Sequence, residues 1–279
     1  MASLRDVGKI IPEKSKSKVP FYSSIQRFEG QIREFKKRQH LRSFQTDKRF
    51  IAYEKKINEF HDKHKGQRCF VVGTGPSLNK TKLELLENEI VFGVNTFYKA
   101  MKQYTVPCTY YLLGDFHVLE DHYKEVLSLD VTLFLGGRAT KTYLDNRDEY
   151  NKIQQHEPIL IRKFADLRDT YNWKIKDLTK GAYACHQVVC DLGLQVPYHM
   201  GFSEVYLLGC DCDYSKGQHF DGEKFSFINP TTEKYWSETF LEYESIKQGY
   251  EADGRKIFNA TPGGKLEVFD RVHLEDVLG

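Results

Sequence analysis

The sequence predicts an α/β fold built on a doubly wound, mostly parallel sheet, with a basic helical extension at its N-terminal side. Three observations lead to this prediction. Short and almost wholly apolar runs recur along the chain, helical stretches separate them, and a glycine turn follows the first run. Strands that are apolar on both faces are typical of parallel sheets whose two faces are covered by helices.

The apolar runs that we expect to form strands are short, as strands of a parallel sheet are. They are residues 69–72, 90–94, 109–113, 131–135, 158–161, 204–208 and 256–259. The helices expected between them are 79–87, 117–128, 181–196 and 233–251. In a doubly wound sheet, ligands bind outside the carboxyl ends of the strands. The residues that follow each strand are therefore the first candidates for a functional site.

Length and composition exclude several classes of protein. With 279 residues, of which 40% are apolar, the chain can form one large α/β domain and an appendage. No apolar run approaches the roughly 20 residues of a membrane-spanning helix, and residues 1–18 lack the apolar centre of a secretion signal. We therefore expect a cytoplasmic protein. Its six cysteines are expected to be free thiols and not zinc ligands: Cys69, Cys108, Cys185, Cys190, Cys210 and Cys212.

Charge divides the chain into two predicted domains. Residues 1–66 carry an excess of Lys and Arg, whereas residues 67–279 carry an excess of Asp and Glu. We expect the charged helices of segment 22–64 either to pack on the main domain or to bind an anionic surface at the inner face of a membrane. Nucleic-acid binding is not expected, because no reader motif accompanies the charge. A homo-oligomer is a further partner that the sequence allows.

The glycine turn after the first strand consists of Gly73, Thr74, Gly75, Pro76 and Ser77. The two glycines let the backbone turn tightly and approach a ligand, and proline is well tolerated in the first turn of a helix. Free N–H groups and the helix dipole at such a helix N-terminus attract phosphate. The turn therefore predicts a nucleotide-binding site. A helix-starting turn without a ligand is the alternative interpretation.

Polar residues also follow the next predicted strands. Asn95 follows the second strand and is a small amide able to contact a base or a ribose. Asp115 and His117 follow the third strand, and Arg138, which suits a phosphate or a carboxylate, follows the fourth. Because parallel strands end at the same edge of the sheet, we expect these side chains to converge on one crevice.

A second anion site is predicted where Thr179, Lys180 and Gly181 open the helix 181–196. Thr179 is expected to cap this helix, and the free N–H groups of its first turn could hold a second anionic group.

Asp211 and Asp213 form a D-x-D directly after strand 204–208. Two carboxylates there could hold Mg²⁺ or Mn²⁺ on a sugar-nucleotide diphosphate, and no other cofactor is expected. Otherwise, aspartates at a strand end cap the next helix. His219 lies in the polar loop that follows and is the preferred general base, because imidazole titrates near neutral pH, with Asp115 or His117 as the alternative base. An exposed loop histidine without a role is the alternative.

The order of these motifs resembles known families. Residues 73–78 read G-x-G-P-S-L, residues 94–98 read V-N-x-F-Y, and residues 200–211 read M-G-F-x-E-V-Y-L-L-G-x-D. The series resembles the bacterial sialyltransferases of lipooligosaccharide synthesis, glycosyltransferase family 42. It is also similar to the broader group related to the archaeal 6-hydroxymethylpterin diphosphokinases. The resemblance covers about residues 67–278.

This resemblance implies a Rossmann-like domain that binds a nucleotide, which in the sialyltransferases is CMP-sialic acid bound without an obligatory metal. It places the glycine turn and Asn95 against the nucleotide, and residues 179–181 against the phosphate or the donor sugar. Tyr214 stands near the first of two tyrosines that assist the departing phosphate, and His219 stands near the second. Residues 225–236, where the family base is expected, contain no histidine. Either His219 has taken over the base role, or the donor and the chemistry differ.

We therefore predict a glycosyltransferase that moves a sugar from a nucleotide-activated donor to a bacterial surface glycan or a lipid-linked glycan. The predicted catalytic residues are His219, Tyr214 and Asp211. The predicted nucleotide-binding residues are Gly73, Thr74, Gly75, Pro76, Ser77, Asn95, Asp115, Thr179, Lys180 and Gly181. One alternative is a pyrophosphokinase of the hydroxymethylpterin type, in which Asp211 and Asp213 hold Mg²⁺ between phosphates. The other is a nucleotide-binding protein without turnover.

Overall fold

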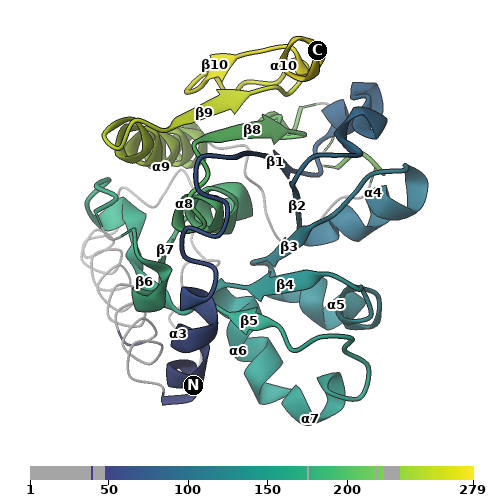
Figure 1. The fold of residues 1–279 in the computed structure, drawn as a ribbon, viewed down its shortest axis with the longest axis vertical. Helices are drawn as coiled ribbons and strands as arrows, with labels where there is room; N and C mark the ends of the chain where they lie inside the picture. The colour runs from purple at the N-terminus through teal and green to yellow at the C-terminus, as the bar shows by residue number, and fades with distance from the viewer. Residues whose placement is uncertain (1–38, 40–47, 175, 216, 218, 223–232) are drawn as a thin grey trace, which may run out of the picture. The chain divides into compact units, whose positions relative to one another are not determined.

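The computed structural model describes residues 39, 48–174, 176–215, 217, 219–222 and 233–279 (Figure 1). The chain divides into the units Met1–Thr46 and Asp47–Gly279, and the second unit contains every strand described below. Among the described residues, no helix is long and apolar enough to cross a bilayer. Most of the predicted membrane-binding segment 22–64 lies outside the described residues, so membrane binding stays a prediction.

The main sheet has eight strands, and every neighbouring pair in it is parallel. Their spatial order is β10-β9-β8-β1-β2-β3-β4-β5. The predicted doubly wound α/β fold is thereby confirmed, and each expected strand is present. The strands are β1 (Arg68–Val72), β2 (Val91–Val94), β3 (Tyr110–Leu113), β4 (Thr132–Leu135), β5 (Ile159–Leu160), β8 (Glu204–Leu208), β9 (Lys256–Asn259) and β10 (Asp270–Arg271).

The order in which successive strands are added across the sheet reverses at β1. From β1 the strands advance to β5 on one side, and the chain then returns to place β8 on the other side of β1. Because parallel crossovers are right-handed, the helices of the two halves cover opposite faces of the sheet. Figure 1 shows α4 and α5 on one side and α8 and α9 on the other. The helices are α3 (Ile51–Asn58), α4 (Tyr98–Gln103), α5 (Phe116–Leu127), α6 (Gly137–Asp145), α7 (Arg147–Tyr150), α8 (Gln195–His199), α9 (Glu233–Glu251) and α10 (Leu274–Leu278).

The central strands are buried on both faces, which explains their unbroken apolar runs. Cys69–Val72 of β1 and the residues of β2 and β3 are all buried. Val72 pairs with Gly93 of β2 and with Leu208 of β8, so these three strands end at the same level of the sheet. The segments that follow them therefore start side by side.

Helix α3 belongs to the main unit and is held there by buried residues and polar contacts. Tyr53 donates from its hydroxyl to Glu157 at 2.8 Å, and Lys56 pairs with the same carboxylate. In addition, Nε2 of His199 lies 3.1 Å from the carbonyl oxygen of Ile57, whose side chain is buried. The last part of the predicted basic extension thus contributes to the core that supports the sheet.

The predicted helix 181–196 is wrong. Gly181 has a φ of +108°, and the residues after it form strand β7 (Ala182–Ala184), which pairs in parallel with β6 (Lys163–Asp166) in a second, two-stranded sheet. Helical structure begins only near residue 188, with a π-helical turn at Val189–Gly193 and then α8. The apolar spacing after Gly181 fitted a helix and a strand equally well, and tertiary pairing with β6 decided between them.

The predicted helix 79–87 is also replaced, by two short 3₁₀-helices at Pro76–Lys80 and Leu83–Leu86. Thr81 between them is extended, and its hydroxyl donates to the carbonyl of Ser77 at 3.0 Å. Such a side-chain bond to the backbone competes with helix continuation. The predicted helices 117–128 and 233–251 are confirmed as α5 and α9.

Candidate functional site

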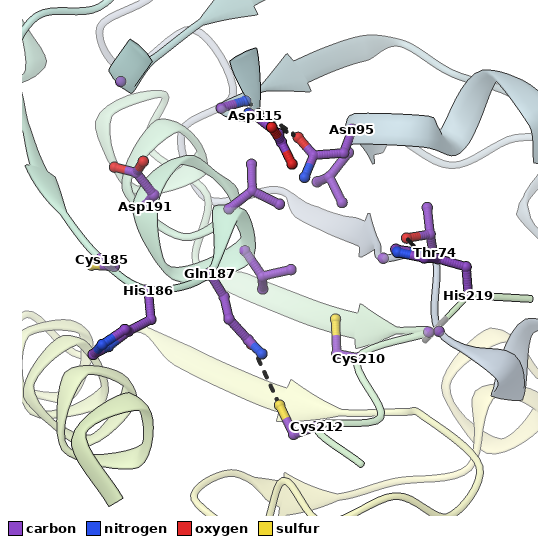
Figure 2. A pocket seen from close by; sticks show the side chains of 18 of the residues that line it. Thr74, Asn95, Asp115, Cys185, His186, Gln187, Asp191, Cys210, Cys212 and His219 are labelled. Atoms are coloured by element: carbon purple, nitrogen blue, oxygen red, sulfur yellow. Dashed lines mark hydrogen bonds between the residues drawn. The ribbon is translucent and has the colours of Figure 1, made fainter. Parts of the chain in front are cut away.

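A cavity of about 590 Å³ opens beside the carboxyl ends of the strands on both sides of β1 (Figure 2). Residues that follow β1, β2, β3, β4 and β8 line it. Its volume is typical of sites for small organic ligands, and doubly wound sheets bind ligands where the strand order reverses. The predicted site residues that line it are Gly73, Thr74, Gly75, Asn95, Asp115, His117, Arg138, Asp211, Tyr214 and His219.

The glycine turn lies against the segment that follows β8. A Cβ atom on Gly75 would lie 1.9 Å from Oδ2 of Asp211, and one on Gly73 would lie 2.5 Å from the carbonyl oxygen of Gly209. Both glycines are therefore required by a close approach between two segments of the chain itself. The sequence alone predicts a close approach to a ligand, and it cannot reveal this partner.

Asp211 caps the 3₁₀-helix that the glycine turn begins. Its carboxylate accepts from the backbone N–H of Ser77 at 3.2 Å and from the Ser77 hydroxyl at 2.7 Å. Burial raises the pKa of the Asp211 carboxyl above its usual range. The N–H group predicted to meet a phosphate thus meets a carboxylate of the protein. Pro76 and Ser77 are not among the cavity-lining residues.

Thr74 and His219 form the contact that closes one side of the cavity. Oγ1 of Thr74 lies 2.8 Å from Nδ1 of His219, as the dashed line in Figure 2 shows. The backbone N–H of Phe220 donates to the Thr74 carbonyl at 2.9 Å, and Asn79 donates to the carbonyl of Phe220. These bonds hold the segment around His219 against the glycine turn.

Asn95 and Asp115 organise the ends of β2 and β3. Asn95 has a φ of +48°, and its Oδ1 accepts from the backbone N–H groups of Gly114 and Asp115 at 3.3 and 3.4 Å. The Asp115 carboxylate in turn accepts from the N–H of His117 at 2.9 Å and caps α5. Both side chains therefore shape the cavity wall that they also line.

A buried ion pair lines the cavity, and the sequence alone did not reveal it. Nζ of Lys163 lies 2.6 and 2.5 Å from the two carboxylate oxygens of Asp191, and the two side chains are 12% and 9% exposed. Burial raises the pKa of Asp191, and the charge of Lys163 opposes this rise. The signal that could have revealed Asp191 is its position as a charged residue inside the apolar run 188–194. Its partner Lys163 belongs to β6, which is distant in the sequence.

A second cation, Arg138, lies at the start of α6 and lines the same cavity. Its guanidinium lies 5.1 Å from the ring centroid of Phe116, another lining residue. Such stacking orients the planar cation while its N–H groups stay able to bind an anion. Arg138 follows β4 and Lys163 begins β6 (Lys163–Asp166), so two cations line the cavity, and one of them, Lys163, is paired with Asp191.

The wall on the α9 side is aromatic. Tyr214 and Tyr235 line the cavity, and the ring of Tyr214 lies 5.2 Å from that of Trp236. Burial raises the pKa of the Tyr235 hydroxyl to about 12 and raises that of Tyr214 as well. Both phenols therefore stay protonated at neutral pH and can donate hydrogen bonds.

The two carboxylates of the D-x-D diverge. Asp211 faces Ser77, whereas Asp213 pairs with Lys265 at 3.3 Å and accepts from the N–H of Ser215 at 3.0 Å. Cys212 between them has a φ of +48° and donates from its thiol to Gln187. A cation held jointly by Asp211 and Asp213 stays a prediction.

Thr179, Lys180 and Gly181 do not line the cavity. They belong to the turn Leu178–Lys180, which Asp177 and not Thr179 caps, and the Thr179 hydroxyl donates to Asp177 at 2.7 Å. The strand that follows this turn, β7, leads into Cys185, His186 and Gln187, which do line the cavity. Residues 179–181, which were predicted to bind a second anion, thus precede β7, whereas the residues that follow β7 line the cavity.

Comparison with family models identifies a family for most of the chain. Residues 45–217, more than half of the chain, match the family described as 6-hydroxymethylpterin diphosphokinase MptE-like. No curated protein matches the chain. The resemblance to the diphosphokinase-related group is confirmed, whereas the resemblance to the sialyltransferases has no support from this match. The chain belongs to the 6-hydroxymethylpterin diphosphokinase MptE-like family.

Proposed function

We propose that the protein is a nucleotide-dependent glycosyltransferase that moves a sugar from an activated nucleotide donor to an acceptor hydroxyl. The observation that carries this proposal is the composition of the cavity at β1 and β8. The residues that line it include the cations Arg138 and Lys163, the protonated phenols of Tyr214 and Tyr235, and the imidazole of His219. These groups suit the binding of a nucleotide and the stabilisation of a departing phosphate.

The placement of the carboxylates favours sugar transfer over diphosphate transfer from ATP. Of the lining carboxylates, Asp115 accepts from His117, Asp191 pairs with Lys163, and Asp211 accepts from Ser77. A kinase-type Mg²⁺ site needs carboxylates that converge on the substrate phosphates. These three carboxylates are engaged by different partners, so the residues as placed do not fit such a site.

The reaction needs a base for the acceptor and positive charge for the leaving group. If Nδ1–H of His219 donates to Thr74, the lone pair of the neutral ring lies on Nε2. Nε2 then takes the proton of the acceptor hydroxyl while the oxygen of that hydroxyl forms a bond to the anomeric carbon of the donor sugar. The bond from that carbon to the donor phosphate breaks, and the nucleotide leaves with the electron pair. Arg138 and the phenol of Tyr214 are the groups that stabilise its charge.

The test is an assay of products from a panel of donors. The protein is incubated with CMP-, UDP- and GDP-linked sugars, and separately with ATP and 6-hydroxymethylpterin, each with Mg²⁺ or with EDTA. We expect one sugar nucleotide to release its nucleotide in EDTA as well as in Mg²⁺, with little release by His219→Ala. Release of AMP from ATP that requires both the pterin and Mg²⁺ would contradict the proposal.

The second candidate function is the pyrophosphokinase, which the family match favours. It predicts that AMP formation depends on the pterin and that Asp211→Asn and Asp213→Asn each abolish it. A protein that binds a nucleotide but releases no product with any donor would be the third function, a nucleotide-binding protein without turnover.

The acceptor of the glycosyltransferase, which we propose to be a surface glycan or a lipid-linked glycan, is sought among hydroxyl compounds that accelerate donor turnover.

A further inference from the structure

A compact group of potential metal ligands lies behind the cavity wall. The sulfur atoms of Cys185 and Cys190 and a carboxylate oxygen of Glu242 all lie within 4.8 Å of one another. Cys185 follows β7, Cys190 belongs to the π-helical turn Val189–Gly193, and Glu242 belongs to α9. Glu242 and Cys190 are both 0% exposed, whereas Cys185 is half-buried and lines the cavity.

Glu242 is an unusual member of this group because a fully buried carboxylate normally has all its oxygens satisfied. Its Oε2 accepts from the backbone N–H of His186 at 3.0 Å. Its Oε1 has no hydrogen-bond partner among the described residues. Nδ1 of His186 lies 3.0 Å from Oε1, yet this ring nitrogen also lacks a hydrogen bond in the described part of the chain. The carboxylate of Glu242 thus faces the two thiols, with His186 as its nearest charged neighbour.

We propose that Cys185, Cys190 and Glu242 bind a divalent transition metal of the Zn²⁺ type. Thiolate sulfur and carboxylate oxygen together select zinc over Mg²⁺ or Ca²⁺, which prefer oxygen alone. Ligand atoms of a tetrahedral zinc ion are roughly 3–4 Å apart, so small side-chain rotations close the present spacing. Binding converts the two thiols to thiolates and releases their two protons to solvent.

The residues around Cys185, Cys190 and Glu242 also fit a buried metal ion. Arg168 makes a two-point contact with Asp166, donates toward Nε2 of His186 at 3.1 Å, and lies 3.8 Å from Oε1 of Glu242. A cation and a histidine next to a ligand carboxylate hold that ligand in place, as outer contacts of metal sites do.

Three protein ligands leave one position of a tetrahedral ion open. Of the three ligands, Cys185 lines the cavity, and Figure 2 labels it next to His186. The site would therefore adjoin the nucleotide pocket without using any residue to which a role in sugar transfer is assigned. Its existence is independent of the proposed function.

The test is a metal titration of the full-length protein without any nucleotide. After treatment with chelator and reductant, the wild type is titrated with Co²⁺ and then with Zn²⁺. We expect one equivalent of Co²⁺ to produce the near-ultraviolet charge-transfer absorption of cobalt bound by thiolates, and Zn²⁺ to displace it. No such absorption with the wild type, or binding without thiolate ligands, would overturn the proposal.

Variants assign the ligands. Cys190→Ser and Glu242→Gln are expected to weaken Co²⁺ binding by more than about 100-fold, because loss of a ligand exceeds the loss of an outer contact. Cys108→Ser, which changes a cysteine outside the group, should bind Co²⁺ like the wild type. Equal binding by Cys190→Ser and the wild type would contradict the assignment. Should a buried variant fail to fold, the half-buried Cys185→Ser and the wild-type spectrum still decide the question.

Discussion

Ser77 donates both its backbone N–H and its hydroxyl to the carboxylate of Asp211, at 3.2 and 2.7 Å. This contact joins the turn after β1 to the turn after β8. These two strands are neighbours, and the order of successive strands across the sheet reverses between them. Since both turns line the cavity, the geometry of the candidate site depends on a bond between residues that lie far apart in the sequence.

Replacing Asp211 by Ala is expected to lower the free energy of unfolding by about 1–3 kcal/mol, because the buried N–H and hydroxyl of Ser77 lose their acceptor. The measurement is urea denaturation. Asp213→Ala is the matched control, since it removes only a pair with the exposed Lys265 and a turn contact, and it should cost less. Equal losses from the two variants would contradict a structural role specific to Asp211.

Thr74→Val tests the orientation of His219. The valine has the shape of threonine but no hydroxyl, so His219 loses the contact that orients its ring. We expect the rate of donor turnover to fall by about 10²-fold or more, in line with the contribution of a positioned base, while donor binding changes little. The measurement is the steady-state kinetics of the wild type and of Thr74→Val. A Thr74→Val enzyme with an unchanged kcat would show that the contact does not position a base.

The buried pair of Lys163 and Asp191 gives a double-mutant prediction. Lys163→Met or Asp191→Leu alone leaves an unpaired buried charge and is expected to destabilise the protein by about 3–5 kcal/mol. The double variant should be more stable than either single one, because no charge is then left unpaired. Unfolding by urea measures all four proteins. Additive losses would mean that the two side chains do not depend on each other.

His199 gives a prediction about pH. Its Nδ1 accepts from the N–H of Leu178, and its Nε2–H donates to Ile57, so the ring is neutral in the fold. Burial lowers the pKa of His199 below its usual 6.5. The unfolded chain therefore binds a proton at a higher pH than the folded one. The contribution of the neutral ring is present above about pH 6.5 and is lost as the pH falls from there through the folded-state pKa.

We accordingly expect a smaller loss of stability between about pH 7.5 and pH 5.5 for His199→Gln than for the wild type. The surface variant His156→Gln serves as the control, since its side chain is 58% exposed. An identical pH dependence of the urea midpoint for His199→Gln and the wild type would contradict a buried neutral role.

The sheet could be predicted from sequence because burial on both faces makes each strand a continuous apolar run. The run around Ala182 could not be assigned correctly, because a short apolar segment fits a helix and a strand alike and pairing with β6 decided the matter. The two-residue strand β10 carries no apolar signal, since Asp270 and Arg271 are exposed. Local pattern thus predicts the strands that form the core and misses those that tertiary contacts impose.

The candidate site shows the same division. The glycine turn, Asn95, Asp115 and His219 could be selected because they follow strands whose ends meet at one edge. The pairing of Lys163 with Asp191 depends on contact between residues distant in sequence, so no local pattern contains it. The contact of Asp211 with Ser77 is of the same kind: the sequence shows a carboxylate at a strand end but not which way it faces.

The measurement that tests the central claim most directly is calorimetric titration with CMP, UDP, GDP, ADP and ATP, in EDTA and in Mg²⁺. We predict that one nucleotide of a sugar donor binds in EDTA as well as in Mg²⁺. Arg138→Ala should weaken this binding about tenfold, the loss expected for one charged hydrogen bond, whereas Lys141→Ala on the same helix, outside the cavity, should not. Binding of ATP alone, and only with Mg²⁺, would contradict the account.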